Sequence, residues 1–112
     1  MASLLLVEDE PSIAGIVSFK LEREGHVLHW VDEAGGAEER AAAVGPDLLL
    51  FDLESGDEGL LGSLCTRWRV LALTGSDDTT GPDRALQAGA VSTIRKPFKP
   101  TVLARVVHEL TG

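Results

Sequence analysis

The 112-residue chain is poor in cysteine, in basic residues and in long apolar runs, and each shortage excludes a class of protein. A single cysteine, Cys65, rules out an internal disulfide and suits a reducing compartment. No apolar stretch approaches the ~20 residues that cross a bilayer, and no basic segment follows Met1 as a secretory signal would require. Only 10 basic residues stand against 18 acidic ones, and the net charge of −8 repels phosphate backbones. We therefore expect a cytoplasmic protein that binds neither a membrane nor nucleic acid directly.

What remains is the composition of one folded domain over residues 1–112, with 44% hydrophobic and 25% charged residues. Short apolar runs alternate with segments of helical spacing. The runs predict strands at 4–7, 27–31, 48–51, 68–73 and 91–95. The spacing predicts a helix from Pro11 to just before Gly25, with Ile13, Ile16, Val17 and Leu21 on its apolar face, and further helices at 38–44, 60–67, 82–88 and 100–110.

Five strands that alternate with five helices predict an α/β fold. We expect a doubly wound, five-stranded parallel sheet with helices on both faces, of the flavodoxin-like kind with strand order 2-1-3-4-5. The third helix should be short, because Gly62 interrupts a segment of barely two turns.

Polar side chains follow the predicted strands at their carboxyl ends. Glu8 and Asp9 follow the first strand, Asp52 the third, Thr74 the fourth, and Lys96 the fifth. In a parallel sheet these ends share one edge, so three carboxylates would crowd together and require a cation. Oxygen donors of this kind suit Mg²⁺, and Asp52 beside a metal and a lysine is a candidate nucleophile toward a phosphoryl group. Each residue alone is more often a cap, a turn former or a surface charge, but the ordered set favours a joint function.

With these residues the whole chain resembles a response-regulator receiver domain of two-component signalling. The resemblance rests on five segments, none decisive alone: LLLVEDEP at 4–11, PDLLLFDL at 46–53, VLALTG at 70–75, ALQAGA at 85–90 and IRKPF at 94–98. It implies a module that takes a phosphoryl group from the phosphohistidine of a sensor histidine kinase or a histidine phosphotransfer protein, and later hydrolyses it. Such a module is not a conventional enzyme, and it switches the interaction with a partner protein or an output domain.

The resemblance also assigns roles to positions. Asp52 would be the phospho-acceptor and would bind Mg²⁺ together with Asp9, with Glu8 mainly through water, and with the backbone carbonyl of Glu54. Thr74 would turn toward the phosphoryl group.

Lys96 would pair with that group, and the bond from Lys96 to Pro97 would be cis.

Three features depart from the family. Thr93 stands where the family has a switch aromatic, and the chain has no tyrosine, so the usual coupling to the output face should be altered. Gly56 replaces a common proline in an acidic loop where Glu54 is expected to compete for the metal or repel the phosphoryl group. Thr74 lies only 22 residues after Asp52, which shortens the third helix and suggests that it is frayed or irregular.

Two other functions remain open from the sequence. The same fold can serve as a pseudo-receiver, an interaction module that needs no phosphorylation. The segment FDLESG at 51–56 also resembles the first motif of haloacid-dehalogenase-type phosphatases, in which Glu54 would be the general acid, although two strands precede it here. Because the chain ends at Gly112, close after the last helix, we expect either a stand-alone receiver or a fragment of a longer protein.

Overall fold

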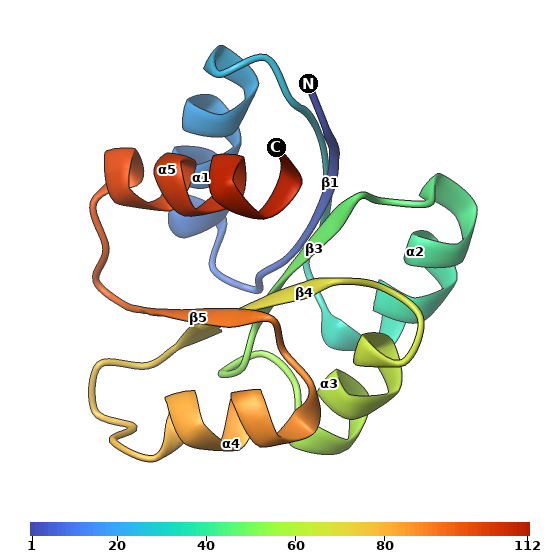
Figure 1. The fold of residues 1–112 in the computed structure, drawn as a ribbon, viewed down its shortest axis with the longest axis vertical. Helices are drawn as coiled ribbons and strands as arrows, with labels where there is room; N and C mark the ends of the chain where they lie inside the picture. The colour runs from blue at the N-terminus through green and yellow to red at the C-terminus, as the bar shows by residue number, and fades with distance from the viewer.

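Five parallel strands form a single sheet in the order β2-β1-β3-β4-β5, as expected from the sequence (Figure 1). The structure, a computed structural model, describes every residue from Met1 to Gly112. The strands are β1 (Ser3–Val7), β2 (Val27–Val31), β3 (Leu48–Asp52), β4 (Val70–Thr74) and β5 (Ser92–Arg95).

Helices cover both faces of this sheet. They are α1 (Pro11–Arg23), a 3₁₀ turn at Ala34–Gly36, α2 (Ala37–Val44), α3 (Glu58–Cys65), α4 (Gly81–Ala88) and α5 (Pro100–Thr111). Helices α1 and α5 pack together on one face, and α2, α3 and α4 cover the other (Figure 1). None of these helices is long and apolar enough to cross a membrane.

Strands β1, β3 and β4 are buried along their length because they divide their side chains between two cores. In β1, Leu4 and Leu6 belong to the core under α1 and α5, whereas Leu5 and Val7 belong to the core under α2 to α4. Continuous apolar runs are typical of parallel strands that are covered on both faces. The apolar runs thus form strands that are packed on both faces. These strands hold the residues at their carboxyl ends in fixed positions.

The expectation of a frayed or irregular third helix is wrong, whereas its shortness is confirmed. Helix α3 has 8 residues and begins at Glu58, two residues before the predicted start. Its first turn is stabilised because the Asp57 carboxylate accepts a hydrogen bond of 2.7 Å from the Leu60 backbone N–H, as a helix N-cap does. Gly62 faces α4, and a Cβ there would make only an ordinary contact of 3.8 Å with the Ala88 carbonyl oxygen.

Some predicted boundaries and faces differ from the structure. Trp68 and Arg69 are predicted in the fourth strand but lie before β4. Val91 is predicted in the fifth strand but lies before β5, and its side chain is 41% exposed. Ile16 was expected on the buried face of α1 but is 54% exposed, because the buried stripe of that helix runs through Val17 and its neighbours at the same spacing. The helical period alone does not separate a buried position from one at the margin of the stripe.

Candidate functional site

The structure brings together four of the five side chains that the sequence placed at strand ends, those of Glu8, Asp9, Asp52 and Lys96, and places Thr74 at the end of the neighbouring strand. Asp52 is the last residue of β3, Thr74 is the last of β4, and Glu8 and Asp9 follow β1 directly. Lys96 lies one residue beyond β5, and its backbone N–H donates to the Thr74 carbonyl oxygen at 2.8 Å. Parallel strand order therefore explains why residues from four separate segments share one site.

Three carboxylates in this site are spaced as a cation would need. One oxygen each from Glu8, Asp9 and Asp52 lies within 4.8 Å of the others. Glu8 and Asp52 are buried, whereas Asp9 is exposed and leaves the cluster open to solvent. A few carboxylates with room for water are the donor set that Mg²⁺ prefers, so these residues fit the ion.

Lys96 supplies the positive charge inside the cluster. Its Nζ lies 2.9 Å from Glu8 Oε1 and 3.1 Å from Asp52 Oδ1, and its side chain is only 12% exposed. Burial by itself lowers the pKa of Lys96, but the two carboxylates outweigh it, and the net pKa is raised. The lysine is therefore a permanent cation at neutral pH.

Glu8 is the residue most perturbed by the crowding. Burial, together with the neighbouring Asp52, raises the pKa of Glu8 from 4.5 to about 7, although Lys96 and the Glu10 backbone N–H act in the opposite direction. The carboxyl group therefore holds a proton readily in this state. A cation that binds here would displace that proton.

Thr74 offers a hydroxyl group with no partner. Its Oγ1 is buried and takes part in no hydrogen bond. A buried polar atom without a partner is uncommon and is costly to a fold. Thr74 follows Leu73, which pairs with Asp52 in the sheet, so this hydroxyl lies at the same edge of the sheet as the carboxylate cluster.

Glu54 adds a fourth acid whose side chain folds back over the site. Its Oε1 lies 3.5 Å from Lys96 Nζ, and its backbone N–H donates to Asp52 Oδ1 at 3.1 Å. The carboxyl group also packs against Gly75. A Cβ at that position would lie 2.7 Å from Glu54 Oε2, which is too close for this packing. The side chain thus contacts the lysine, in addition to any role of its backbone carbonyl toward a metal.

Ser55 is a site residue that the sequence analysis missed. Its Oγ donates to Asp52 Oδ2 at 2.6 Å and accepts from the Asp9 backbone N–H at 3.1 Å. The signal was a hydroxyl three residues after the acid, in the turn where the Ser55 N–H donates to the Asp52 carbonyl oxygen at 2.9 Å. A second missed contact is the Trp30 indole, which donates to the Glu8 carbonyl oxygen at 2.8 Å and makes Trp30 the tryptophan in contact with the site.

Gly56, at the position of the family's common proline, is required by its neighbours. A Cβ at this position would lie 2.5 Å from Phe51 Cζ and 2.9 Å from Ala34 Cβ. Because the Phe51 ring is fully buried, it has no room to withdraw. We expect Gly56→Ala to lower the free energy of unfolding by about 1 to 3 kcal/mol, as overpacked cores do. Urea unfolding measures this, with Gly35→Ala as control because a Cβ there meets nothing within 4 Å; equal stabilities of the two variants would contradict the packing argument.

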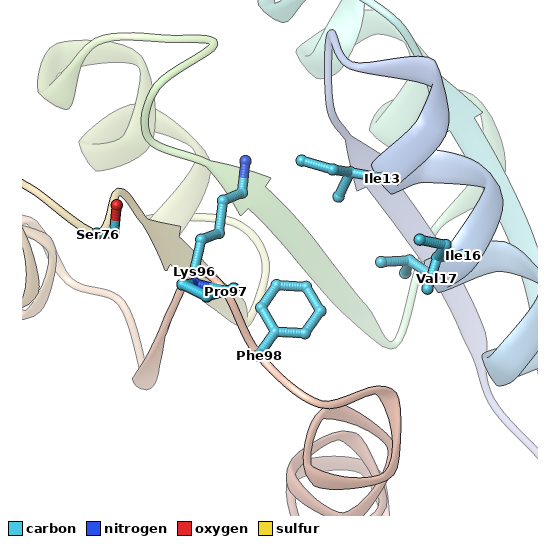
Figure 2. Close-up of a pocket in the computed structure, with 7 residues that line it drawn as sticks. All are labelled: Ile13, Ile16, Val17, Ser76, Lys96, Pro97 and Phe98. Atoms are coloured by element: carbon cyan, nitrogen blue, oxygen red, sulfur yellow. The ribbon is translucent and has the colours of Figure 1, made fainter.

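An apolar cavity of about 370 Å³ adjoins the site on the α1 side. Figure 2 shows Ile13, Ile16 and Val17 of α1 facing Phe98 across it. Lys96, Pro97 and Ser76 complete the lining. The bond from Lys96 to Pro97 is cis, as expected. Lys96 thus links the acidic cluster to an apolar cavity.

Comparisons with known proteins identify a family for this chain. The family described as the response regulator receiver domain matches residues 4–108. The DNA-binding response regulator MtrA of Mycolicibacterium smegmatis is 32% identical over 92% of this chain and 48% of its own length. The swarming motility regulation protein RssB of Serratia marcescens is 32% identical over 93% of this chain and 51% of its own length. The chain thus spans about half the length of these relatives.

Solved structures extend the agreement to the fold. NtrX from Brucella abortus superposes with a TM-score of 0.91 at 26% identity, over 98% of this chain and 26% of that one. The receiver domain of the Francisella response regulator 1452 superposes with a TM-score of 0.89 at 21% identity, over 99% of this chain and 97% of that one, which supports the fold alone. From its sequence match, its relatives and its site geometry, this chain belongs to the response regulator receiver domain family.

Proposed function

We propose that this domain accepts a phosphoryl group on Asp52 from the phosphohistidine of a sensor histidine kinase or a histidine phosphotransfer protein. One observation carries the proposal: the buried Asp52 carboxylate lies between Lys96 and a carboxylate cluster that fits Mg²⁺. This carboxylate lies 3.1 Å from the Lys96 ammonium group at the carboxyl end of β3, which is where ligands of parallel sheets bind and where a nucleophile would meet a phosphoryl group.

The transfer is an exchange of one bond for another. A carboxylate oxygen of Asp52 attacks phosphorus, the P–N bond to the imidazole breaks, and the imidazole nitrogen leaves with the electron pair and takes up a proton. Lys96, which lies 3.1 Å from Asp52, and the Thr74 hydroxyl, which has no other partner, would bind the phosphoryl oxygens as their charge develops. Mg²⁺ bound by Glu8, Asp9, Asp52 and the Glu54 carbonyl would neutralise charge on the same oxygens.

The surface beside the site supports a helical protein as donor. Ile16, which lines the apolar cavity of Figure 2, is 54% exposed, and Phe19, three residues further along α1, is 64% exposed. Exposed apolar side chains around a polar centre are typical of an interaction surface. A helix that carries the phosphohistidine would lie along α1 and present its imidazole to Asp52.

Incubation with Mg²⁺ and acetyl phosphate, or with beryllofluoride, tests the proposal. We expect one phosphoryl group per chain by intact mass spectrometry, and a fluorescence change from Trp30, whose indole contacts the Glu8 backbone. Asp52→Ala should abolish both responses. An equal response in Asp52→Ala would contradict the assignment, and no response in the wild type would point to a phosphorylation-independent interaction module. Steady turnover of a small phosphoester would support the phosphatase alternative instead.

The Glu54 carboxylate should shorten the life of the phosphorylated state. It competes with the phosphoryl group for Lys96 and repels it, but its side chain is 59% exposed, so water screens the effect. We expect Glu54→Gln to lengthen the acyl-phosphate half-life about threefold. Gly75→Ala should act in the same direction, since its Cβ would displace the Glu54 carboxyl group. Glu38→Gln, which removes one exposed charge on α2, is the control; the same change in half-life there would argue for net charge instead.

A further inference from the structure

The Ser55 hydroxyl has a fixed direction in the site. Its oxygen accepts the Asp9 backbone N–H at 3.1 Å, and its proton is donated to Asp52 Oδ2 at 2.6 Å. The Ser55 backbone N–H is bound to the Asp52 carbonyl oxygen as well, so the residue is held on both sides of the turn. The hydroxyl therefore acts as a constant donor to the carboxylate.

Asp52 thereby has donors on both of its carboxylate oxygens when it carries no phosphoryl group. Oδ1 accepts the Glu54 N–H and pairs with Lys96, and Oδ2 accepts the Ser55 hydroxyl. Hydrogen bonds to an ionised carboxylate are stronger than those to a neutral acyl oxygen. The Ser55 bond is therefore strongest in the free carboxylate and weaker in the acyl phosphate.

We infer that the Ser55 hydroxyl sets the transfer potential of the phosphoryl group on Asp52, by favouring the free carboxylate over the acyl phosphate. This inference rests on the proposed function. In hydrolysis, a water oxygen attacks phosphorus, the P–O bond to Asp52 breaks, and the electron pair returns to the carboxylate. Charge grows on the carboxylate as that bond breaks, so the Ser55 donor stabilises the transition state more than the acyl phosphate.

The same donor slows phosphoryl acceptance. The attacking carboxylate loses charge on the way to the transition state, and the Ser55 bond is weakened as it does so. Slower acceptance and faster loss are both expected whether Oδ1 or Oδ2 of Asp52 bonds to phosphorus, because the carboxylate shares its charge between the two oxygens. Ser55 thus favours a domain that gives up its phosphoryl group readily, to water or to a second imidazole, over one that stores it.

Acyl-phosphate kinetics of Ser55→Ala test the inference. The protein is phosphorylated with acetyl phosphate and Mg²⁺, the donor is removed, and the loss of the phosphoryl group is followed by acid-quenched mass spectrometry, with and without a chelator. We expect the phosphoryl group on Ser55→Ala to last about threefold to tenfold longer and to be acquired faster, as loss of a hydrogen bond to a charged group implies. The longer life should persist in the chelator, because the donor belongs to the protein.

Three variants serve as controls. Ser55→Thr keeps the hydroxyl and should restore the wild-type half-life, which a merely structural role of the side chain would not require. Ser55→Cys keeps the size but has a weak donor, and should behave like Ser55→Ala even where the alanine variant folds poorly. Ser63→Ala, at an exposed position of α3, should leave the half-life unchanged.

The outcomes separate this inference from the proposed function. A wild type that acquires a phosphoryl group on Asp52, with the same or a shorter half-life in Ser55→Ala, would overturn the role of Ser55 alone. Failure of Ser55→Thr to restore the half-life would do the same. A wild type that acquires no phosphoryl group would overturn the proposed function and this inference together.

Discussion

Asp52→Asn is expected to abolish phosphoryl acceptance and to give a protein more stable than the wild type. The amide has the shape of the carboxylate but is not a nucleophile toward phosphorus. Stability should rise because Asp52 and Glu8 are like charges in one buried site, with Lys96 as the shared cation. Without the Asp52 charge, Lys96 pairs with Glu8 alone, and the pKa of Glu8 should fall from about 7.

Urea unfolding in a chelator measures the gain, which we expect to be about 1 kcal/mol. Asp77→Asn, at an exposed position in the loop after β4, removes the same charge from the surface and should leave stability unchanged. Mg²⁺ should stabilise the wild type and the control by mass action but have a smaller effect on Asp52→Asn, which lacks one carboxylate of the cluster. A phosphoryl group on Asp52→Asn would show that another residue is the acceptor.

The sequence predicted the site because strand ends are easy to locate. The apolar run from Leu48 ends at Asp52, and the run from Val70 ends at Thr74, so parallel topology brings both residues to one edge without knowledge of any contact. Lys96 follows the fifth strand, which runs in the same direction as the others, so it is expected at the same edge. The fold and the five strand-end residues could therefore be predicted from local patterns.

Side-chain directions in the loop after β3 could not be predicted in this way. Glu54 is predicted to offer its backbone carbonyl to the metal and a carboxylate that competes for it; the structure adds a contact of that carboxylate with Lys96 and Gly75, where the lack of a Cβ leaves room for it. Ser55 was not considered at all, since its hydrogen bond to Asp9 joins residues that are 46 positions apart. Contacts of this kind depend on how two loops meet, which neither periodicity nor composition encodes.

The same limit applies to the margins of helices. Ile16 and Val17 are adjacent apolar residues of α1, yet one is 54% and the other 1% exposed. Both residues are apolar enough to be buried. The positions of α5 and of the sheet decide which of the two is covered. In this chain the uncovered position lies beside the candidate site, where a partner would contact it.

Lys96→Met is expected to cause the largest loss of stability among single changes in the site, and the loss should grow with pH. Methionine keeps the length of the side chain but leaves Glu8 and Asp52 buried without a cation. Removal of one partner from a buried ion pair costs about 3 to 5 kcal/mol. The variant should also accept a phosphoryl group more slowly than the wild type, because the positive charge that would bind the phosphoryl oxygens is gone.

The pH dependence follows from the proton on Glu8. Its folded pKa, about 7, lies above its ordinary value of 4.5, so between these values the folded protein binds more protons than the unfolded chain. The free energy of unfolding contributed by this group therefore falls as pH rises through that range. Without Lys96, which lowers the pKa of Glu8, the folded pKa rises further and the loss at high pH increases.

Urea unfolding in a chelator at about pH 5.5 and about pH 8 measures the difference, which should be smaller at the lower pH, where Glu8 holds a proton, and near the full amount at the higher one. Lys99→Met, an exposed lysine three residues further on, is the matched control and should show little loss at either pH. An equal loss for Lys96→Met at both values would mean that the lysine contributes by packing alone. A loss that grows with pH would show that its charge holds the two buried carboxylates together.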